Sequence, residues 1–333
     1  MSTPMGRREL VGDAVWRGEE LLRRKDWLHH LDEIELDEVD AWIDASKSEP
    51  NTELGPNISH RLSGVQDRLE NGAGATMIRG LDRNRYDQTQ LERLFLKLAS
   101  QLGTPLSQSA EGQLVFSVRN AGFADADPRA RGPNTKKKLS FHTDRCDVIG
   151  FLCIQPAKSG GENQLVSSAA LFNEILNQRP DLLEQLMQPY CYQRHGFDTA
   201  NELPYTKQPI FSFFEGKFAA NFLRVLIERA HKNPELPPMT ELQIEALDFL
   251  ELLADQPGMH VTFRQQPGDI VFMNNWITLH RRHEFEDDDD PKLRRHILRV
   301  WLSMPNSRAV DPRFAGNYGA TAAGAIRGGI KTV

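Results

Sequence analysis

A histidine and an aspartate separated by one residue, His142 and Asp144, are the first candidates for chemistry in this 333-residue chain. If their segment is a strand, residues i and i+2 point to the same face, so an imidazole and a carboxylate could converge on one metal ion. The pattern alone is weak, because chance predicts ~1.4 such pairs from this composition and the chain holds two. The other pair, His30 and Asp32, lies in a polar N-terminal region, whereas His142 follows an apolar stretch at 139–141.

A third ligand can come from His280. It ends a strand-like run, 271–279, that follows a Pro-Gly-Asp turn at 267–269. Two histidines and one carboxylate leave three coordination positions open, which is the facial arrangement of non-heme Fe(II) oxygenases, where the open positions take a co-substrate and O₂. The same three side chains around a metal-bound water would also suit a zinc hydrolase, so both classes stay open at this point.

Two arginines on one face of a late strand favour the oxygenase. Strand alternation through 295–302 places Arg295 and Arg299 on one face with an isoleucine and a tryptophan, and His296 with three aliphatic residues on the other. Two guanidinium groups on so apolar a strand are costly unless they meet anions. A dicarboxylate would meet that need, because guanidinium forms paired hydrogen bonds to a carboxylate, whereas a hydrolase needs no such clamp.

The elements that must position these side chains are many short strands with clustered helices. Strands are predicted at 75–78, 113–118, 139–144, 148–154, 164–168, 191–194, 210–214, 217–221, 260–264, 269–274 and 296–303. Helices are predicted at 36–46, 60–70, 86–102 and 240–254, and a capping box of Thr240 and Gln243 starts the last one. Because no alternating strand–helix–strand rhythm occurs, we expect a mainly β fold, a jelly-roll core flanked by α-helices.

With these elements in order, the chain resembles the taurine dioxygenase-like (TauD/TfdA) family of Fe(II)/2-oxoglutarate-dependent oxygenases. The likeness spans residues 75–308 and rests on the His-Thr-Asp motif at 142–144, a Gly-Gly turn at 160–161, the Pro-Gly-Asp turn before His280, and the arginine strand. The resemblance implies a double-stranded β-helix in which His142, Asp144 and His280 bind iron. It makes Arg295 the partner of the distal carboxylate of 2-oxoglutarate, and it places Arg299 near the co-substrate and an anionic substrate group.

One departure from the family pattern follows the glycine pair, where Glu162-Asn163 replaces the common Asp-Thr. Asn163 is then the candidate to hydrogen-bond 2-oxoglutarate through its amide. The resemblance implies a dioxygenase that hydroxylates a small, anionic organic substrate, or cleaves it after hydroxylation, while 2-oxoglutarate and O₂ become succinate and CO₂. A non-catalytic jelly-roll sensor of a small acid is a further alternative to the enzyme.

Composition limits the partners and the compartment. The net charge is −6, from 40 basic and 46 acidic residues, and six of the acids lie together at 284–290, which gives no support to a nucleic-acid or membrane partner. No apolar run reaches the length of a membrane span, and the N-terminal residues lack an apolar signal region, so we expect a cytoplasmic protein. Three cysteines without CxxC spacing disfavour disulfides and a cysteine-rich zinc site.

Three regions are expected along the chain. Residues 1–74 form a helical extension, residues 75–308 form the dioxygenase domain, and residues 309–333 form a C-terminal tail. Residues 120–138, rich in Gly, Pro and charged residues, are expected to be a lid loop, because long loops in compact domains commonly cover functional sites. The sequence selects no particular substrate, and it leaves the oligomeric state open, a homo-oligomer included.

Overall fold

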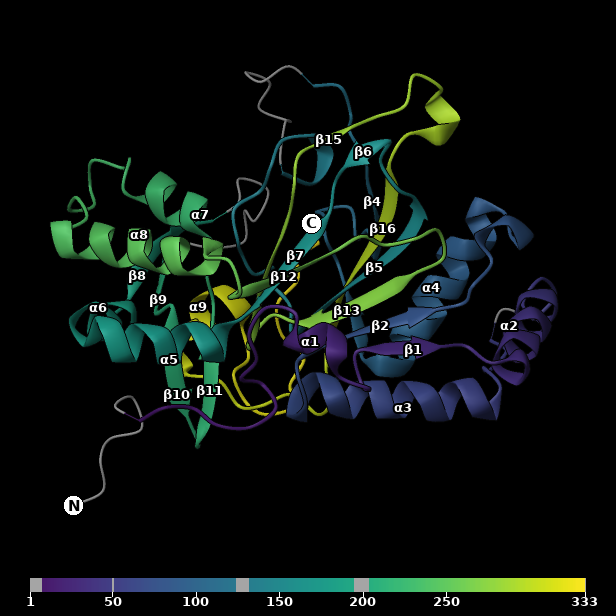
Figure 1. Ribbon diagram of the computed structural model, residues 1–333, viewed down its shortest axis with the longest axis horizontal. Coiled ribbons are helices and arrows are strands. Elements are labelled where there is room, and N and C mark those ends of the chain that lie inside the picture. The colour runs from purple at the N-terminus through teal and green to yellow at the C-terminus, as the bar shows by residue number, and fades with distance from the viewer. Residues whose placement is uncertain (1–7, 50, 124–131, 195–203, 333) are drawn as a thin grey trace.

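Two antiparallel-rich sheets that face each other form the centre of the molecule, and helices lie outside them (Figure 1). The computed structural model describes residues 8–49, 51–123, 132–194 and 204–332. In the larger sheet the strand order is β1-β2-β13-β5-β16-β3, and β4 also pairs with β16. Its strands are β1 (Leu28–His30), β2 (Ala75–Arg79), β3 (Thr104–Leu106), β4 (Val115–Val118), β5 (Val148–Gln155), β13 (Ile270–Asn274) and β16 (His296–Ser303).

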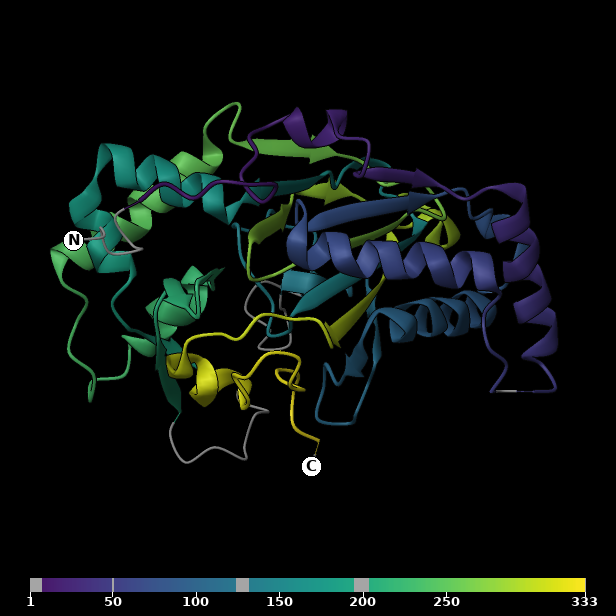
Figure 2. The ribbon, with the colours of Figure 1, turned by 90° about the horizontal axis from the view of Figure 1, so that it is seen from below.

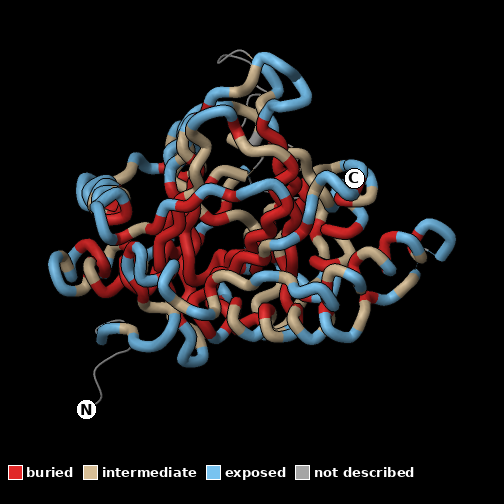
Figure 3. Tube along the Cα trace, turned by 45° about the vertical axis from the view of Figure 1, so that its right-hand side comes forward, coloured by how far each residue is buried: buried red, intermediate tan, exposed pale blue. Residues whose placement is uncertain are grey.

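The smaller sheet has the order β12-β7-β14, with all neighbours antiparallel. Its strands are β12 (His260–Phe263), β7 (Asn163–Ser167) and β14 (Thr278–Arg282), and a short pair, β6 (Ser159–Gly160) with β15 (Phe285–Glu286), continues it. Ile149 and Trp301 of the larger sheet and Leu165 and Val261 of the smaller one belong to one buried cluster, so the inner faces of the two sheets pack together. Figure 3 shows this interior as buried strands surrounded by helices with exposed outer faces. The predicted jelly roll is confirmed.

Helices cover the outer face of the larger sheet on one side. They are α2 (Glu33–Ala45), α3 (Pro56–Asn71) and α4 (Gln88–Leu102), and α3 and α4 run side by side in Figure 2. The alternation of β16 explains the packing: Leu298, Val300 and Leu302 face these helices, whereas Ile297 and Trp301 face inward. The strand therefore presents its predicted apolar face to the helices and its arginine face to the interior.

A second group of helices packs around two β-hairpins at the other end of the molecule (Figure 1). The helices are α5 (Ser168–Gln178), α6 (Pro180–Leu186), α7 (Arg224–Ala230) and α8 (Glu241–Asp255), and the hairpin strands are β8 (Tyr190–Gln193), β9 (Tyr205–Gln208), β10 (Phe211–Phe214) and β11 (Lys217–Ala220). The predicted capping box of Thr240 and Gln243 is present at the start of α8. Short elements complete the chain: α1 (Glu20–Arg23), α9 (Ala315–Tyr318), and 3₁₀ turns η2 (Arg83–Arg85), η3 (Gly132–Asn134), η4 (Pro291–Leu293) and η5 (Pro312–Phe314).

Two strand predictions near the site are wrong. Residues 139–144 form no strand, because their N–H groups bond to three separate parts of the chain and only His142 makes a β-bridge, with His280. The run 271–279 is not one strand either: it turns at 275–277 and crosses from β13 in the larger sheet to β14 in the smaller one. His280 therefore lies in the middle of β14.

Segments near both ends of the described part of the chain contact the core. Strand β1 pairs in parallel with β2, and the side chain of Arg327 is fully buried against Asp147. The division into extension, domain and tail stays a prediction. Among the described residues, no helix is long and apolar enough to cross a membrane.

Candidate active site

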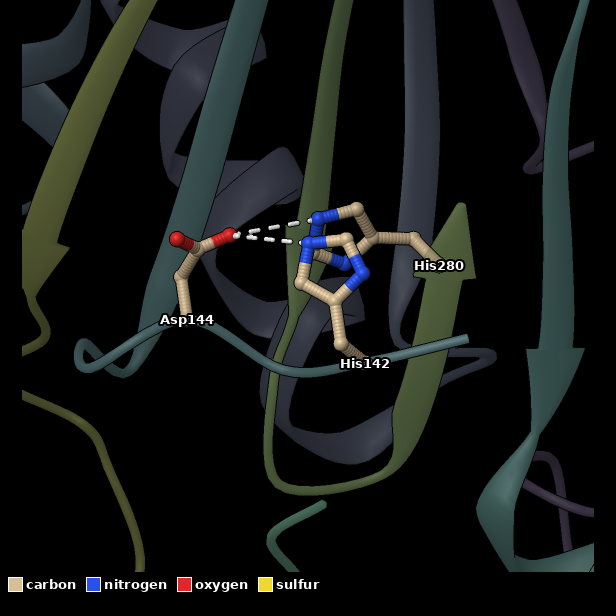
Figure 4. A group of neighbouring side chains, drawn as sticks. All are labelled: His142, Asp144 and His280. Atoms are coloured by element: carbon tan, nitrogen blue, oxygen red, sulfur yellow. Dashed lines mark ion pairs between the residues drawn. The ribbon is translucent and has the colours of Figure 1, made fainter. Parts of the chain in front are cut away.

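His142, Asp144 and His280 converge between the two sheets (Figure 4). Oδ2 of Asp144 lies 3.3 Å from Nε2 of His280 and 3.9 Å from Nε2 of His142. The candidate ligand atoms all lie within 4.8 Å of one another. Figure 4 shows the two imidazoles next to each other beside the carboxylate, with His280 on β14 and the other two residues on the segment before β5; the ring planes are tilted by 44°. The structure thus brings together the three predicted ligands, although His142 and His280 are 138 residues apart in the sequence.

Backbone and side-chain hydrogen bonds fix this geometry. His142 and His280 exchange two backbone hydrogen bonds of 3.0 Å, which holds the irregular segment against β14. Nδ1 of His142 donates to the Ser140 carbonyl at 2.8 Å, so Nε2 keeps its lone pair for a metal. The backbone N–H of Asp144 donates to Oδ1 of Asn275, in the turn between β13 and β14, at 3.0 Å. The convergence is therefore built by three elements and does not need the predicted strand.

The protonation states suit a metal site. Burial, and then the nearby His280, lower the pKa of His142 to about 4, so this imidazole is neutral at physiological pH. Burial raises the pKa of Asp144, but the charge of Arg299 and the two histidines together outweigh burial and hold the pKa well below its usual range. Oδ2 of Asp144 and Nδ1 of His280 are buried without a hydrogen bond. A neutral imidazole and a carboxylate whose buried oxygen lacks a hydrogen bond fit a divalent cation. The mixed nitrogen and oxygen donors suit Fe(II).

Arg299 lies on the inner face of β16, next to the carboxylate. Its Nη1 is 3.6 Å from Oδ1 of Asp144, and its Nε donates to Oε1 of Gln108 at 2.7 Å. The guanidinium also stacks over the rings of Phe116 and Trp301, 5.1 and 5.0 Å from their centroids. Arg299 is thus fixed at the metal site, and it does not pair with the acidic loop at 284–290.

Arg295 precedes β16 and lines a small cavity together with Asn163. Its side chain is buried, its Nη1 has no hydrogen-bond partner, and burial lowers the pKa to about 10, which leaves the group charged. Nδ2 of Asn163, the first residue of β7, donates to Oε1 of Gln265 at 3.2 Å. The guanidinium rests on the ring of Phe285, 5.2 Å from its centroid. A buried cation without a partner is costly, and a carboxylate beside Arg295 would compensate its charge.

The Gly160-Gly161 turn allows this cavity to form. Both residues have positive φ, 68° and 73°, and a Cβ at Gly160 would lie 2.3 Å from the carbonyl oxygen of Glu284. Only glycine tolerates this conformation and contact without displacement of the backbone. The turn therefore carries the chain from β6 into β7 directly beside Arg295.

Several residues that hold the site were not found from the sequence. Asn275 is described above, and Gln108 fixes Arg299. The C-terminal region contributes Tyr318, whose hydroxyl donates to the Asp144 carbonyl at 3.3 Å, and Arg327, which bonds Asp147 at 2.6 Å. These contacts join distant segments and follow no periodic pattern, so the sequence carries no signal for them.

The predicted lid loop is described only in part. Residues 124–131 lie outside the described residues. On the near side of that gap, the Ala121 N–H donates to the Asn134 carbonyl at 3.0 Å, and on the far side Arg282 donates to the Lys137 carbonyl. The ends of the loop are thus tied to each other and to β14, and its role as a lid stays a prediction.

The fold and the site define a class. A jelly roll that holds two histidines and one carboxylate between its sheets, with a buried arginine nearby, is the arrangement of a non-heme iron oxygenase. The sequence comparison specifies the family: residues 52–301 match the taurine catabolism dioxygenase TauD, TfdA family. The chain belongs to this family, and it is an Fe(II)- and 2-oxoglutarate-dependent dioxygenase, as predicted.

Individual relatives are distant. FR-33289 synthase of Streptomyces rubellomurinus is 27% identical over 320 residues, which cover 91% of this chain and 92% of that protein. The taurine hydroxylase-like protein SAT17 of Stachybotrys chartarum is 27% identical over 88% of this chain and 79% of that protein. A uridine-5'-phosphate dioxygenase of an Amycolatopsis species is 28% identical over 62% of this chain and 77% of its own.

Solved structures share the fold. Asparagine oxygenase, in complex with Fe(II), 3-hydroxyasparagine and succinate, is 18% identical with a TM-score of 0.64, over 90% of this chain and 99% of that one. The non-heme iron oxygenase OrfP, in complex with iron and α-ketoglutaric acid, is 15% identical with a TM-score of 0.60, over 83% of this chain and 94% of that one. At these identities the likeness shows the fold alone.

Proposed function

We propose that His142, Asp144 and His280 bind Fe(II), that Arg295 and Asn163 hold 2-oxoglutarate, and that Arg299 faces an anionic group of a small organic substrate. The observation that carries this assignment is the guanidinium of Arg295, which is buried in the jelly roll with one nitrogen unpaired. Other buried guanidinium groups of this chain, such as those of Arg308 and Arg327, are bonded to carboxylates. Here the missing partner is supplied by the distal carboxylate of the co-substrate.

In this assignment the chain provides orientation and a dry site. Fe(II) would supply the activation of O₂ and the oxidation of a substrate C–H bond, while 2-oxoglutarate becomes succinate and CO₂. Arg295 fixes the far end of the co-substrate, so that its keto acid end points toward the His–Asp–His cluster. The Nδ1–H of His142, bonded to the Ser140 carbonyl, keeps that imidazole in the tautomer that coordinates through Nε2.

The substrate class follows from Arg299. The Nε of Arg299 donates to Gln108, and its Nη1 lies 3.6 Å from the Asp144 carboxylate. The positive charge of Arg299 therefore lies next to the candidate metal site. One relative is named for a phosphate ester, uridine-5'-phosphate, which supports an anionic substrate. The product is the hydroxylated substrate, or its cleavage products where the hydroxylated carbon carries a leaving group.

The test is a screen for O₂ uptake coupled to succinate formation, with Fe(II), 2-oxoglutarate and a panel of small phosphates, sulfonates, carboxylates and amino acids. We expect one substrate class to raise both rates together, with one succinate formed per O₂ consumed. Neither a zinc hydrolase nor a non-catalytic sensor would consume O₂. Hydrolysis of a panel member in the presence of zinc, with no uptake of O₂ under iron, would contradict the assignment.

A further inference from the structure

A second and larger cavity lies outside the jelly-roll interior. It has a volume of about 500 Å³ and is bordered by the first turn of α4, the end of β5 and the loop before β16. Figure 1 shows this loop, with η4, extending past the end of β16 on the side of the molecule where α4 lies. None of the three candidate metal ligands lines it. The cavity therefore lies beside the site described above, and it shares only Arg295 with that site's small cavity.

The lining of this cavity is strongly basic. Five cationic side chains line it: Arg83, Arg119, Lys292, Arg294 and Arg295. Two acidic residues, Asp87 and Asp287, also line the cavity. Asp87 accepts a hydrogen bond from the backbone N–H of Gln90, and Asp287 accepts one from the backbone N–H of Arg295.

None of the five cations forms an ion pair with a carboxylate among the described residues. Arg83 donates to the Ile154 carbonyl, Arg294 donates to two carbonyls of its own loop, and Lys292 makes no side-chain hydrogen bond within the described part of the chain. Elsewhere in the molecule arginines commonly pair with acids, as Arg79 does with Asp269 at 2.7 Å and Arg308 with Glu70 at 2.8 Å. The concentration of unpaired cations around one cavity therefore creates a positive potential that an anion would neutralise.

A buried histidine, His296, also lines the cavity. His296 is 7% exposed, and its Nε2 lies 3.0 Å from Oγ of Ser117 and 2.9 Å from Nη2 of Arg119. Burial, and then the charges of Arg119, Arg295 and Arg83, lower the pKa of His296 to about 4. The imidazole of His296 is therefore neutral, contacts the guanidinium of Arg119, and cannot neutralise the cations of the cavity.

The first turn of α4 borders the cavity through Asp87, Gln88 and Leu91. A capping box of Asp87 and Gln90 already closes this helix end, so the positive charge around the cavity comes from the guanidinium groups and the ammonium.

We propose that this cavity binds an organic phosphate monoester. A tetrahedral dianion accepts hydrogen bonds from several directions, which matches cations that come from η2, from the end of β4 and from the 287–295 loop, whereas a carboxylate is best satisfied by a single planar fork. The volume exceeds what a bare phosphate needs, and Tyr86, Leu91 and Ile154 in the lining offer apolar surface to an organic group. This site holds none of the candidate metal ligands; Arg295 is shared with the proposed 2-oxoglutarate pocket, and Arg83, Arg119, Lys292 and Arg294 line this cavity alone.

The test is calorimetric titration with phenyl phosphate of the full-length, metal-loaded protein, kept under argon with saturating 2-oxoglutarate. We expect binding that weakens as NaCl is added. In the double variant Arg119→Gln/Lys292→Gln we expect the affinity to fall at least about tenfold, because two charge-assisted contacts are lost. The matched control is Arg23→Gln/Lys25→Gln, which removes two exposed cations that lie outside the cavity lining and form no ion pair among the described residues, and it should bind as the wild type does.

A third variant separates this cavity from the substrate site. Arg299→Gln should retain phenyl phosphate binding, because Arg299 does not line the cavity. Loss of binding in Arg299→Gln with full binding in the double variant would place the ligand at the metal site and overturn the proposal. The absence of binding heat at millimolar phenyl phosphate would also overturn the proposal. So would phthalate, a dicarboxylate, if it bound as tightly as phenyl phosphate and lost the same affinity in the double variant. Circular dichroism confirms that each variant is folded.

Discussion

The guanidinium of Arg299 faces the carboxylate of Asp144, with Nη1 3.6 Å from Oδ1, while the other carboxylate oxygen faces two imidazoles. One buried carboxylate therefore lies between a permanent cation and the candidate metal position. Without a metal, Arg299 is the main charge that stabilises the ionised Asp144. With a metal bound, the carboxylate is neutralised from both sides.

Arg299→Met should therefore destabilise the metal-free protein more than the metal-bound protein. Removal of one partner from a buried charge pair leaves the other uncompensated, so we expect the free energy of unfolding to fall by about 3 kcal/mol with chelator present. With saturating Mn(II) the loss should be smaller by about 1 kcal/mol or more, because the metal takes over part of the compensation. Urea unfolding in both conditions measures the difference, with Arg299→Lys as the charge-preserving control. An equal loss in both conditions would argue against the coupling.

His142→Ala should abolish tight metal binding. Loss of one of three protein ligands removes a third of the donor set and leaves Asp144 beside a single imidazole. The chain offers a matched control in His30, which is exposed and stands at the same spacing from Asp32, an N-cap of α2. We expect His30→Ala to bind Mn(II) as the wild type does, measured by electron paramagnetic resonance of the free ion. Metal binding that survived in His142→Ala would refute the assigned ligand set.

The convergence of His142, Asp144 and His280 could be predicted because it depends on residue types and their order along the chain. A His-x-Asp pair, a later histidine and two arginines on one strand face are rare together, and the apolar alternation of β16 was sufficient to assign its two faces correctly. The start of α8 was predictable for a similar reason, since its capping box is a local interaction between Thr240 and Gln243.

Other features of the site depend on contacts between distant segments. Residues 139–144 have the composition of a strand, but their backbone groups are divided between β14, Phe222 and Asn275, so no ladder forms. The turn at 275–277 could not be recognised from the sequence, because the chain stays buried as it passes from one sheet to the other and the residues around the turn are apolar. The contacts of Gln108, Tyr318 and Arg327 are single polar interactions across more than 100 residues and leave no periodic trace.

Arg327→Met should detach the C-terminal region from the segment that follows the His-Thr-Asp motif. Arg327 is 2% exposed, and its Nε donates to Oδ1 of Asp147 at 2.6 Å, while the Trp276 indole donates to the same oxygen. Because the variant leaves a buried carboxylate without its cation, we expect a loss of about 3–5 kcal/mol in urea unfolding and weaker Mn(II) binding. Lys331→Met, at an exposed position in the same region, is the control. A loss below about 1 kcal/mol would show that the ion pair does not hold this region.

His296 should make the protein less stable in mild acid. Its pKa is lowered to about 4 in the folded protein, whereas an unfolded histidine titrates near pH 6.5. Below pH 6.5 the histidine is therefore protonated in the unfolded chain but stays neutral in the folded protein. The free energy of unfolding falls as the pH drops toward 4. Between pH 7.5 and 5.5 the contribution is about 1 kcal/mol.

The measurement is urea unfolding at both pH values for wild type and His296→Gln. We expect the difference between the two pH values to be smaller in His296→Gln by that amount. An unchanged difference would mean that His296 is protonated in the folded protein.

Binding of 2-oxoglutarate at the iron site and by Arg295 is measured by an anaerobic titration of the Fe(II)-loaded protein with 2-oxoglutarate, followed by the visible charge-transfer band of a chelated keto acid. We predict the band in the wild type and in the Lys158→Gln control, an exposed position near the Gly-Gly turn. In Arg295→Gln we predict at least about 30-fold weaker 2-oxoglutarate binding with unchanged Fe(II) binding, because a buried charge pair is lost. Iron bound without any band in the wild type, or wild-type affinity for 2-oxoglutarate in Arg295→Gln, would contradict the account.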